Sequence, residues 1–119
     1  SIIHVCGELD SQGTWQDVNG DGHFNIFLWV KNTGSSRIAA PEMSDLFLGP
    51  EGAFGRVVHQ SGASGSQPYW TCDVENGDAW DPTTTLKITV HYVSTLESGR
   101  YFVKLVLPNG VADDDYFGL

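Results

Sequence analysis

Apolar and polar residues alternate along most of this chain, a pattern that predicts short β-strands rather than helices. The clearest example lies at residues 24–31, where every second residue from Phe24 to Val30 is apolar and therefore lies on one face of a strand. Phe27 and Trp29 occupy the other face, where a half-buried strand would carry polar residues. This strand is therefore either covered on both sides or contacts a partner through its second face.

The same alternation, interrupted by glycine- and proline-rich turns, predicts about seven to eight strands. The expected strands are residues 2–9, 24–32, 45–48, 54–59, 69–74, 85–93, 100–107 and 111–119. No segment of about ten residues has helical periodicity. The last strand carries three consecutive aspartates, which suit an edge strand because charge discourages pairing with another chain. The sequence predicts one all-β domain, residues 1–119, with an immunoglobulin-like β-sandwich fold.

Charge and hydropathy narrow the set of partners. The chain has 119 residues, a formal net charge of −9 and a pI of about 4.5. An acidic surface of this kind argues against nucleic acid or an anionic membrane surface as the main partner. No apolar run approaches the roughly 18 residues that span a bilayer, and the chain begins directly in strand-like sequence. We therefore expect a mature or truncated product that lacks its targeting segment.

The two cysteines, Cys6 and Cys72, lie far apart in strand-like sequence. A disulfide between them would close a long loop and would stabilise the domain by roughly 2–4 kcal/mol. The alternative is a pair of small buried thiols. Neither cysteine has a second cysteine or a histidine at metal-ligand spacing, which disfavours a metal site.

One short motif resembles half of a calcium-binding loop. Asp17, Asn19 and Asp21 supply oxygen atoms at the first, third and fifth positions, and Gly22 follows at the sixth, as in an EF-hand loop and in dockerins. The twelfth position, where a bidentate acid belongs, is Leu28. The alternatives are an acidic turn without a ligand and a weak Ca²⁺ site. We expect no other cofactor.

No arrangement of residues predicts catalysis. The four histidines lack metal-ligand spacing, and no phosphate-binding loop or nucleophile motif is present. The four tryptophans, Trp15, Trp29, Trp70 and Trp80, leave a second class of function open, because exposed tryptophans in a β-sandwich can stack on sugar rings. A carbohydrate-binding module is therefore the alternative to a protein-interaction domain.

The outward faces of two strands predict a protein interface. Phe27, Trp29, Phe102 and Val106 all lie on the faces opposite the expected core. If the two strands belong to one sheet, these side chains form one apolar outer patch suited to subunit contact. The alternative is that the connection at residues 35–44 covers this face within a single monomer.

Several segments carry a family resemblance. The strongest are the Val-Lys-Asn-Thr-Gly-Ser run at residues 30–35 and the Trp-Asp-Pro run at residues 80–82. Together with other segments in the same order, they resemble the archaeal flagellum (archaellum) accessory proteins FlaG and FlaF. The other segments are residues 45–48, 86–90, 96–106, 108–111 and 116–117. The loop at residues 11–21 and the cysteine pair depart from the family pattern, and archaellins and pilins share related head domains.

The resemblance implies a non-enzymatic stator component of the archaellum motor. Such a protein is membrane-anchored by an N-terminal transmembrane helix, which is absent from this chain, and its β-sandwich lies outside the cell membrane, beneath the surface layer. It would form homo-oligomers and would bind surface-layer protein or a FlaF/FlaG-type partner. The alternatives are a carbohydrate-binding module and an archaellin- or pilin-type head domain.

Overall fold

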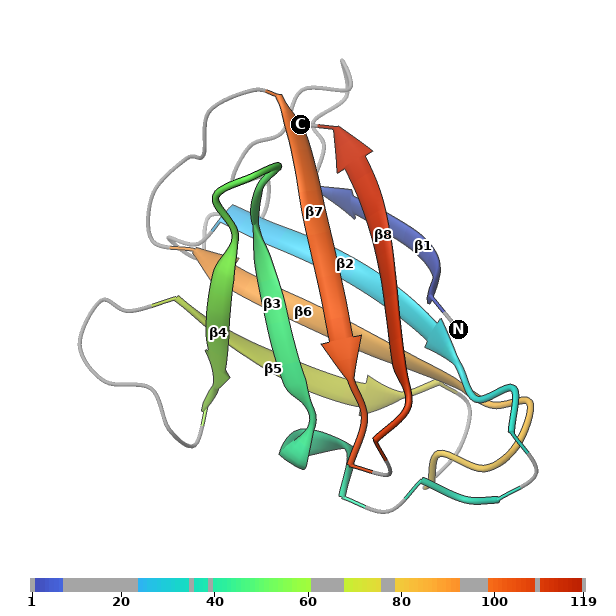
Figure 1. The fold of residues 1–119 in the computed structure, drawn as a ribbon. Helices are drawn as coiled ribbons and strands as arrows, with labels where there is room; N and C mark the ends of the chain where they lie inside the picture. The colour runs from blue at the N-terminus through green and yellow to red at the C-terminus, as the bar shows by residue number, and fades with distance from the viewer. Residues whose placement is uncertain are drawn as a thin grey trace, which may run out of the picture.

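A computed structural model of the chain contains eight β-strands (Figure 1). It describes residues 2–7, 24–34, 36–38, 40–60, 68–75, 79–92, 99–108 and 110–118. The strands are β1 (Ile2–Gly7), β2 (Phe24–Lys31), β3 (Asp45–Pro50), β4 (Gly55–His59), β5 (Tyr69–Val74), β6 (Thr85–Tyr92), β7 (Arg100–Val106) and β8 (Ala112–Gly118), and a short 3-10 helix, η1, spans Pro41–Met43. Each strand agrees with a predicted one to within two residues at either end, so the all-β prediction is confirmed.

One continuous sheet folds over into two layers. Its strand order is β1-β2-β6-β5-β4-β3-β7-β8. All pairings are antiparallel except β4 with β5, which joins only two residue pairs in parallel. In Figure 1, β3, β4, β7 and β8 cross in front of β1, β2, β5 and β6. We call these four-stranded groups the front layer and the back layer, and their solvent-facing sides the front face and the back face. This arrangement confirms the predicted immunoglobulin-like β-sandwich.

The alternating apolar positions meet between the layers. In β6, Leu86, Ile88, Val90 and Tyr92 are buried and the intervening residues are half-buried, as period-two geometry requires. The back layer also contributes alternate residues of β2, and the front layer contributes alternate residues of β3 and β7. The main members of this core are Ile26, Leu28, Val30, Leu46, Leu48, Val57, Trp70, Trp80, Val103 and Leu105.

Asn32 joins two of the segments that carry the family resemblance. It follows β2 directly and is 4% exposed. Its side-chain Nδ2 donates hydrogen bonds to the carbonyl oxygens of Ser36 (2.9 Å) and Trp80 (3.1 Å), and its Oδ1 accepts one from the Gly34 amide (3.0 Å). The Trp80 Nε1 in turn donates to the Thr84 carbonyl at 2.9 Å. These buried and partly buried bonds satisfy polar groups of the turns at this end of the sandwich, so both segments hold the fold together.

The last strand, β8, lies at one end of the strand order, as its aspartate run predicts. The Ile2 amide of β1, at the opposite end of the order, donates a hydrogen bond to the Asp113 Oδ2 of β8 at 2.6 Å. The two ends of the sheet are therefore close in space, and an inward-placed carboxylate protects the edge.

Of the two alternatives for the cysteines, the Cys6–Cys72 disulfide is wrong for this fold. Cys72 is a free, half-buried cysteine. Cys6 lies on β1 and Cys72 on β5, with β2 and β6 between them. Because neighbouring strands lie about 4.8 Å apart, the two Cα atoms are separated by roughly 14 Å, well beyond the reach of a disulfide. Sequence separation alone could not reveal the two intervening strands.

Candidate functional site

The residues predicted to form one interface lie on two opposite faces of the molecule. Phe27 and Trp29 occupy outward positions of β2 on the back face, whereas Phe102 and Val106 occupy outward positions of β7 on the front face. All four side chains are half-buried. The single patch that the sequence suggested would need β2 and β7 in one layer, and that condition is not met. Their role as interface residues stays a prediction.

A lysine covers the aromatic residues on the back face. The rings of Phe27 and Trp29 lie 6.0 Å apart. Lys87 of β6 pairs with Trp29 across the strands, and its Nζ lies 4.6 Å from the centre of the Phe27 ring and 5.6 Å from that of Trp29. Both distances suit cation–π contact. We call Phe27, Trp29 and Lys87 the back cluster; its rings already have a cationic partner within the monomer.

The front face carries a row of three aromatic residues that crosses β7 and β8. The Phe102 ring lies 4.6 Å from that of Phe54 and 5.1 Å from that of Tyr116. The Arg100 guanidinium lies 4.4 Å from the centre of the Tyr116 ring. Phe54 and Tyr116 are 44% and 45% exposed, and both rank among the large exposed hydrophobic residues of the described chain. We call Phe54, Phe102, Tyr116 and Arg100 the front cluster.

A glycine makes room for the front cluster. Gly49 pairs with Phe102 across β3 and β7. A Cβ atom at Gly49 would lie 2.6 Å from the Phe54 Cα, closer than carbon atoms pack, and in a tight contact of 3.2 Å with the Phe54 Cβ. The missing side chain thus lets Phe54, in the turn between β3 and β4, fold back over the sheet. Phe54 was expected at the start of the strand at residues 54–59 and was not assigned to the interface, whereas in the structure it lies in the turn before β4. The glycine opposite Phe102 was the available signal.

Exposed ion pairs flank the front cluster. Arg100 Nε lies 3.3 Å from the Glu51 carboxylate, and Arg56 Nη2 lies 3.1 Å from the Asp45 carboxylate. Such solvent-exposed pairs contribute little to stability, but they form a charged rim beside exposed aromatic rings. An apolar centre with a polar rim is the usual composition of a protein–protein contact surface.

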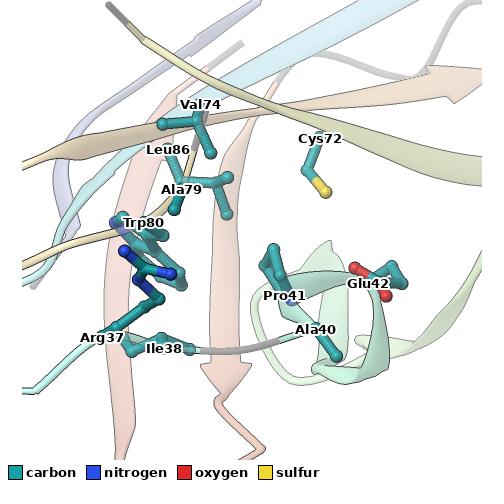
Figure 2. A pocket seen from close by; sticks show the side chains of 10 residues that line it. All are labelled: Arg37, Ile38, Ala40, Pro41, Glu42, Cys72, Val74, Ala79, Trp80 and Leu86. Atoms are coloured by element: carbon teal, nitrogen blue, oxygen red, sulfur yellow. The ribbon is translucent and has the colours of Figure 1, made fainter. Parts of the chain in front are cut away.

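A cavity of about 310 Å³ lies between η1 and the back layer (Figure 2). Ile38, Trp80 and Leu86 are among its lining residues, and Arg37, which also lines it, is paired with Asp81 at 2.7 Å. Figure 2 shows the Cys72 side chain pointing towards Pro41 and Glu42. Burial of the Cys72 thiol, together with the Glu42 and Asp73 carboxylates, raises its pKa to about 11, so the thiol is protonated at neutral pH and is a weak nucleophile.

The tryptophans give little support to sugar binding. Trp70 and Trp80 are each 1% exposed and cannot stack on a ligand. Trp29 is half-buried beside Lys87. Trp15 lies outside the described residues, and so does the predicted calcium motif at Asp17, Asn19 and Asp21. Within the described ranges, no three metal-ligating side chains lie together, and no helix is long and apolar enough to cross a membrane.

Solved structures share this fold. The archaellum periplasmic stator protein FlaG from Sulfolobus acidocaldarius aligns with a TM-score of 0.73 and 24% sequence identity, over 98% of this chain and 95% of that chain. A chain in the complex of the stator proteins FlaF and FlaG from the same organism aligns with a TM-score of 0.71 and 24% identity, over 98% of this chain and 85% of that chain. The domain is therefore a β-sandwich of the FlaG type, and the predicted resemblance is confirmed at the level of the fold.

A sequence relative is archaeal. A protein of Archaeoglobus fulgidus described as uncharacterized is 35% identical over 118 residues, which cover 92% of this chain and 69% of the relative. This chain belongs to the same family as that protein. No family profile matches the chain.

Proposed function

We propose that this domain is a non-enzymatic stator component of the archaellum motor that acts through protein–protein contact. Two findings support the proposal. Its fold matches a protein described as an archaellum periplasmic stator over nearly the whole of both chains, and a sequence relative is archaeal. In this role the domain lies outside the cell membrane, beneath the surface layer, and belongs to a membrane-anchored protein.

The front cluster is the observation that carries the proposal. It places two exposed aromatic rings and an arginine beside a half-buried phenylalanine. Aromatic and arginine side chains supply most of the binding energy in typical interfaces. Burying a few hundred Å² of such surface contributes several kcal/mol at about 25 cal/mol per Å², before the costs of association are subtracted. The front face therefore suits a FlaF/FlaG-type partner, a second copy of the domain or surface-layer protein.

The proposal assigns no chemical step to the domain. The cavity beneath η1 has a protonated thiol at neutral pH and an arginine already paired with Asp81. A weak Ca²⁺ site at Asp17, Asn19 and Asp21 remains a separate proposal. It requires binding heat when the domain is titrated with millimolar calcium, and a flat titration would exclude it.

The proposed function is tested by titrating the domain with the soluble domain of the FlaF-type protein from the same organism in a calorimeter. We expect micromolar binding, and we expect Phe54→Ser to weaken it about tenfold because an exposed ring of the front cluster is lost. Met43→Ser is the matched control, since Met43 is 70% exposed but lies on η1, away from the cluster. No binding by the unaltered domain, or equal losses in the two variants, would contradict the proposal.

A further inference from the structure

Among the described residues, β5 has no paired strand on one side along about two thirds of its length. On one side it pairs with β6 from Tyr69 to Val74. On the other side it pairs with β4 only at Tyr69 and Trp70. Among the described residues, no strand pairs with residues 71–74 on this side. In Figure 1, β5 continues past β4 towards η1.

Backbone hydrogen-bonding groups face this open edge. The Glu75 amide donates to the Thr85 carbonyl of the β6 side at 2.8 Å. In an antiparallel pair, hydrogen-bonded and non-hydrogen-bonded positions alternate, so Asp73 also bonds to β6 whereas Cys72 and Val74 do not. The N–H and C=O groups of Cys72 and Val74 therefore point away from β6, where they can pair with an additional strand.

The cavity beneath η1 lies beside the same edge. Cys72 and Val74 both line it, and both pair with core positions of β6, so their side chains face the interior. A residue of an added strand directly opposite Cys72 or Val74 would lie on that same face of the sheet. Its side chain would enter the cavity of about 310 Å³, next to Trp80 and Leu86.

Two carboxylates give the edge a negative charge. Asp73 and Glu42 are exposed, and among the described residues neither forms an ion pair. Asp73 pairs with Lys87 by register, but the Lys87 Nζ lies over the Phe27 and Trp29 rings instead. Both carboxylates lie close enough to Cys72 to raise the pKa of its thiol. The electrostatic potential is therefore negative both in the cavity and along the strand edge.

We propose that residues 72–74 of β5 accept an extended segment of another protein as an additional strand, with an aliphatic side chain in the cavity and lysine or arginine beside Asp73. Backbone pairing would supply the affinity, and the cavity and the carboxylates would supply the selectivity. A second copy of this domain fits poorly, because pairing two β5 edges would bring Asp73 and Glu42 towards their own counterparts. This binding mode is separate from the front cluster and does not depend on it.

The first test uses a peptide of alternating valine and lysine with capped ends, titrated into the isotope-labelled domain and followed by amide NMR. We expect the Cys72 and Val74 amides to shift and to exchange more slowly with solvent, because they gain partners. The same peptide with N-methyl groups on alternate backbone nitrogens, and a peptide of alternating valine and glutamate, should bind at least about tenfold more weakly. Equal binding of the N-methylated peptide would overturn the proposal, and so would shifts confined to the front or back cluster.

A pair of variants at Val74 isolates the backbone contribution. Val74→Pro removes the N–H that faces the edge and leaves the bonds to β6 intact, which proline permits on an edge. Val74→Ala keeps the N–H and loses a comparable part of the side chain. We expect peptide binding to fall about tenfold in the proline variant and less than about threefold in the alanine variant. Equal affinities of the two variants would overturn the proposal. If the proline variant fails to fold, binding of the N-methylated peptide to the unaltered domain tests the backbone contribution instead. Peptide-independent dimerisation with shifts at Cys72 and Val74 would identify a second copy as the occupant and would also overturn it.

Discussion

The front and back faces of the sandwich both carry aromatic residues at outward positions, yet only the front face leaves them available. On the back face, the Lys87 ammonium lies over Phe27 and Trp29, and both rings are half-buried. On the front face, Phe54 and Tyr116 are 44% and 45% exposed. Alternation assigns Phe27 and Phe102 the same role, and both are half-buried, but only the neighbours of Phe102 include exposed aromatic rings among the described residues.

The difference shows how a β-sandwich can restrict binding to one face. Both clusters have a cation over a ring, since Arg100 lies over Tyr116, so the difference between them is exposure: Phe27 and Trp29 are half-buried, whereas Phe54 and Tyr116 are exposed. We therefore propose that the back cluster contributes mainly to the stability of the monomer and the front cluster mainly to association. The following variants test this division, in order of decreasing expected effect.

Trp29→Ser should destabilise the domain and leave association almost unchanged. Removing a half-buried indole and its contact with Lys87 should lower the free energy of unfolding by about 2–3 kcal/mol, measured by urea denaturation. Association of the folded variant, measured by light scattering, should stay within about threefold of the unaltered domain. A large loss of association without loss of stability would place the interface on the back face instead.

Gly49→Ala should affect both stability and association. The new Cβ would lie 2.6 Å from the Phe54 Cα, so the turn must move, and overpacking of this kind costs about 1–3 kcal/mol. Displacing Phe54 should also weaken association. Gly55→Ala is the matched control, since nothing lies within 4 Å of its added Cβ and its unfolding free energy should change by less than about 1 kcal/mol. Equal effects of the two variants would show that Gly49 does not position Phe54.

The double variant Phe54→Ser, Tyr116→Ser should act on association alone. Both side chains are exposed, so the free energy of unfolding should change by less than about 1 kcal/mol. Light scattering should show self-association at least about tenfold weaker, equivalent to about 1.4 kcal/mol. Unchanged association of the stable, folded variant would exclude the front cluster as the contact surface.

Lys87→Met should have the smallest effect. The substitution keeps the aliphatic part of the side chain and removes the charge over Phe27 and Trp29, at a cost of about 0.5–1 kcal/mol in unfolding free energy. Lys31→Met changes the net charge equally at an exposed position of β2 on the same face of the sheet, and we expect a change within about 0.5 kcal/mol. The difference between the two thermal denaturation curves measures the cation–π contribution.

Local patterns in the sequence predicted the strands well. The alternation in β2, β6 and β7 placed their core residues correctly, and the aspartate run identified β8 as an edge. The order of the strands depends on long-range pairing, which alternation does not encode. For this reason the sequence left a Cys6–Cys72 disulfide open, although Cys72 is free, and it allowed the aromatic residues of β2 and β7 to form one patch, although they lie on opposite faces.

The front cluster was only partly predictable. Phe102 was identified because it alternates with the core residues of β7, whereas Phe54 lies in a turn and reaches the sheet only over Gly49. The cation over the back cluster was also missed, since Lys87 lies far from Phe27 in sequence and next to it only after β2 and β6 pair. Both omissions concern contacts between strands that are distant in sequence.

Sedimentation velocity of the purified domain over a concentration series tests the central claim most directly, namely that this is an assembly module with an available front face. The account predicts a sedimentation coefficient that rises with concentration and a flat profile for the Phe54→Ser, Tyr116→Ser variant. A strict monomer at every concentration, or an equal rise in the double variant, would contradict assembly through the front face.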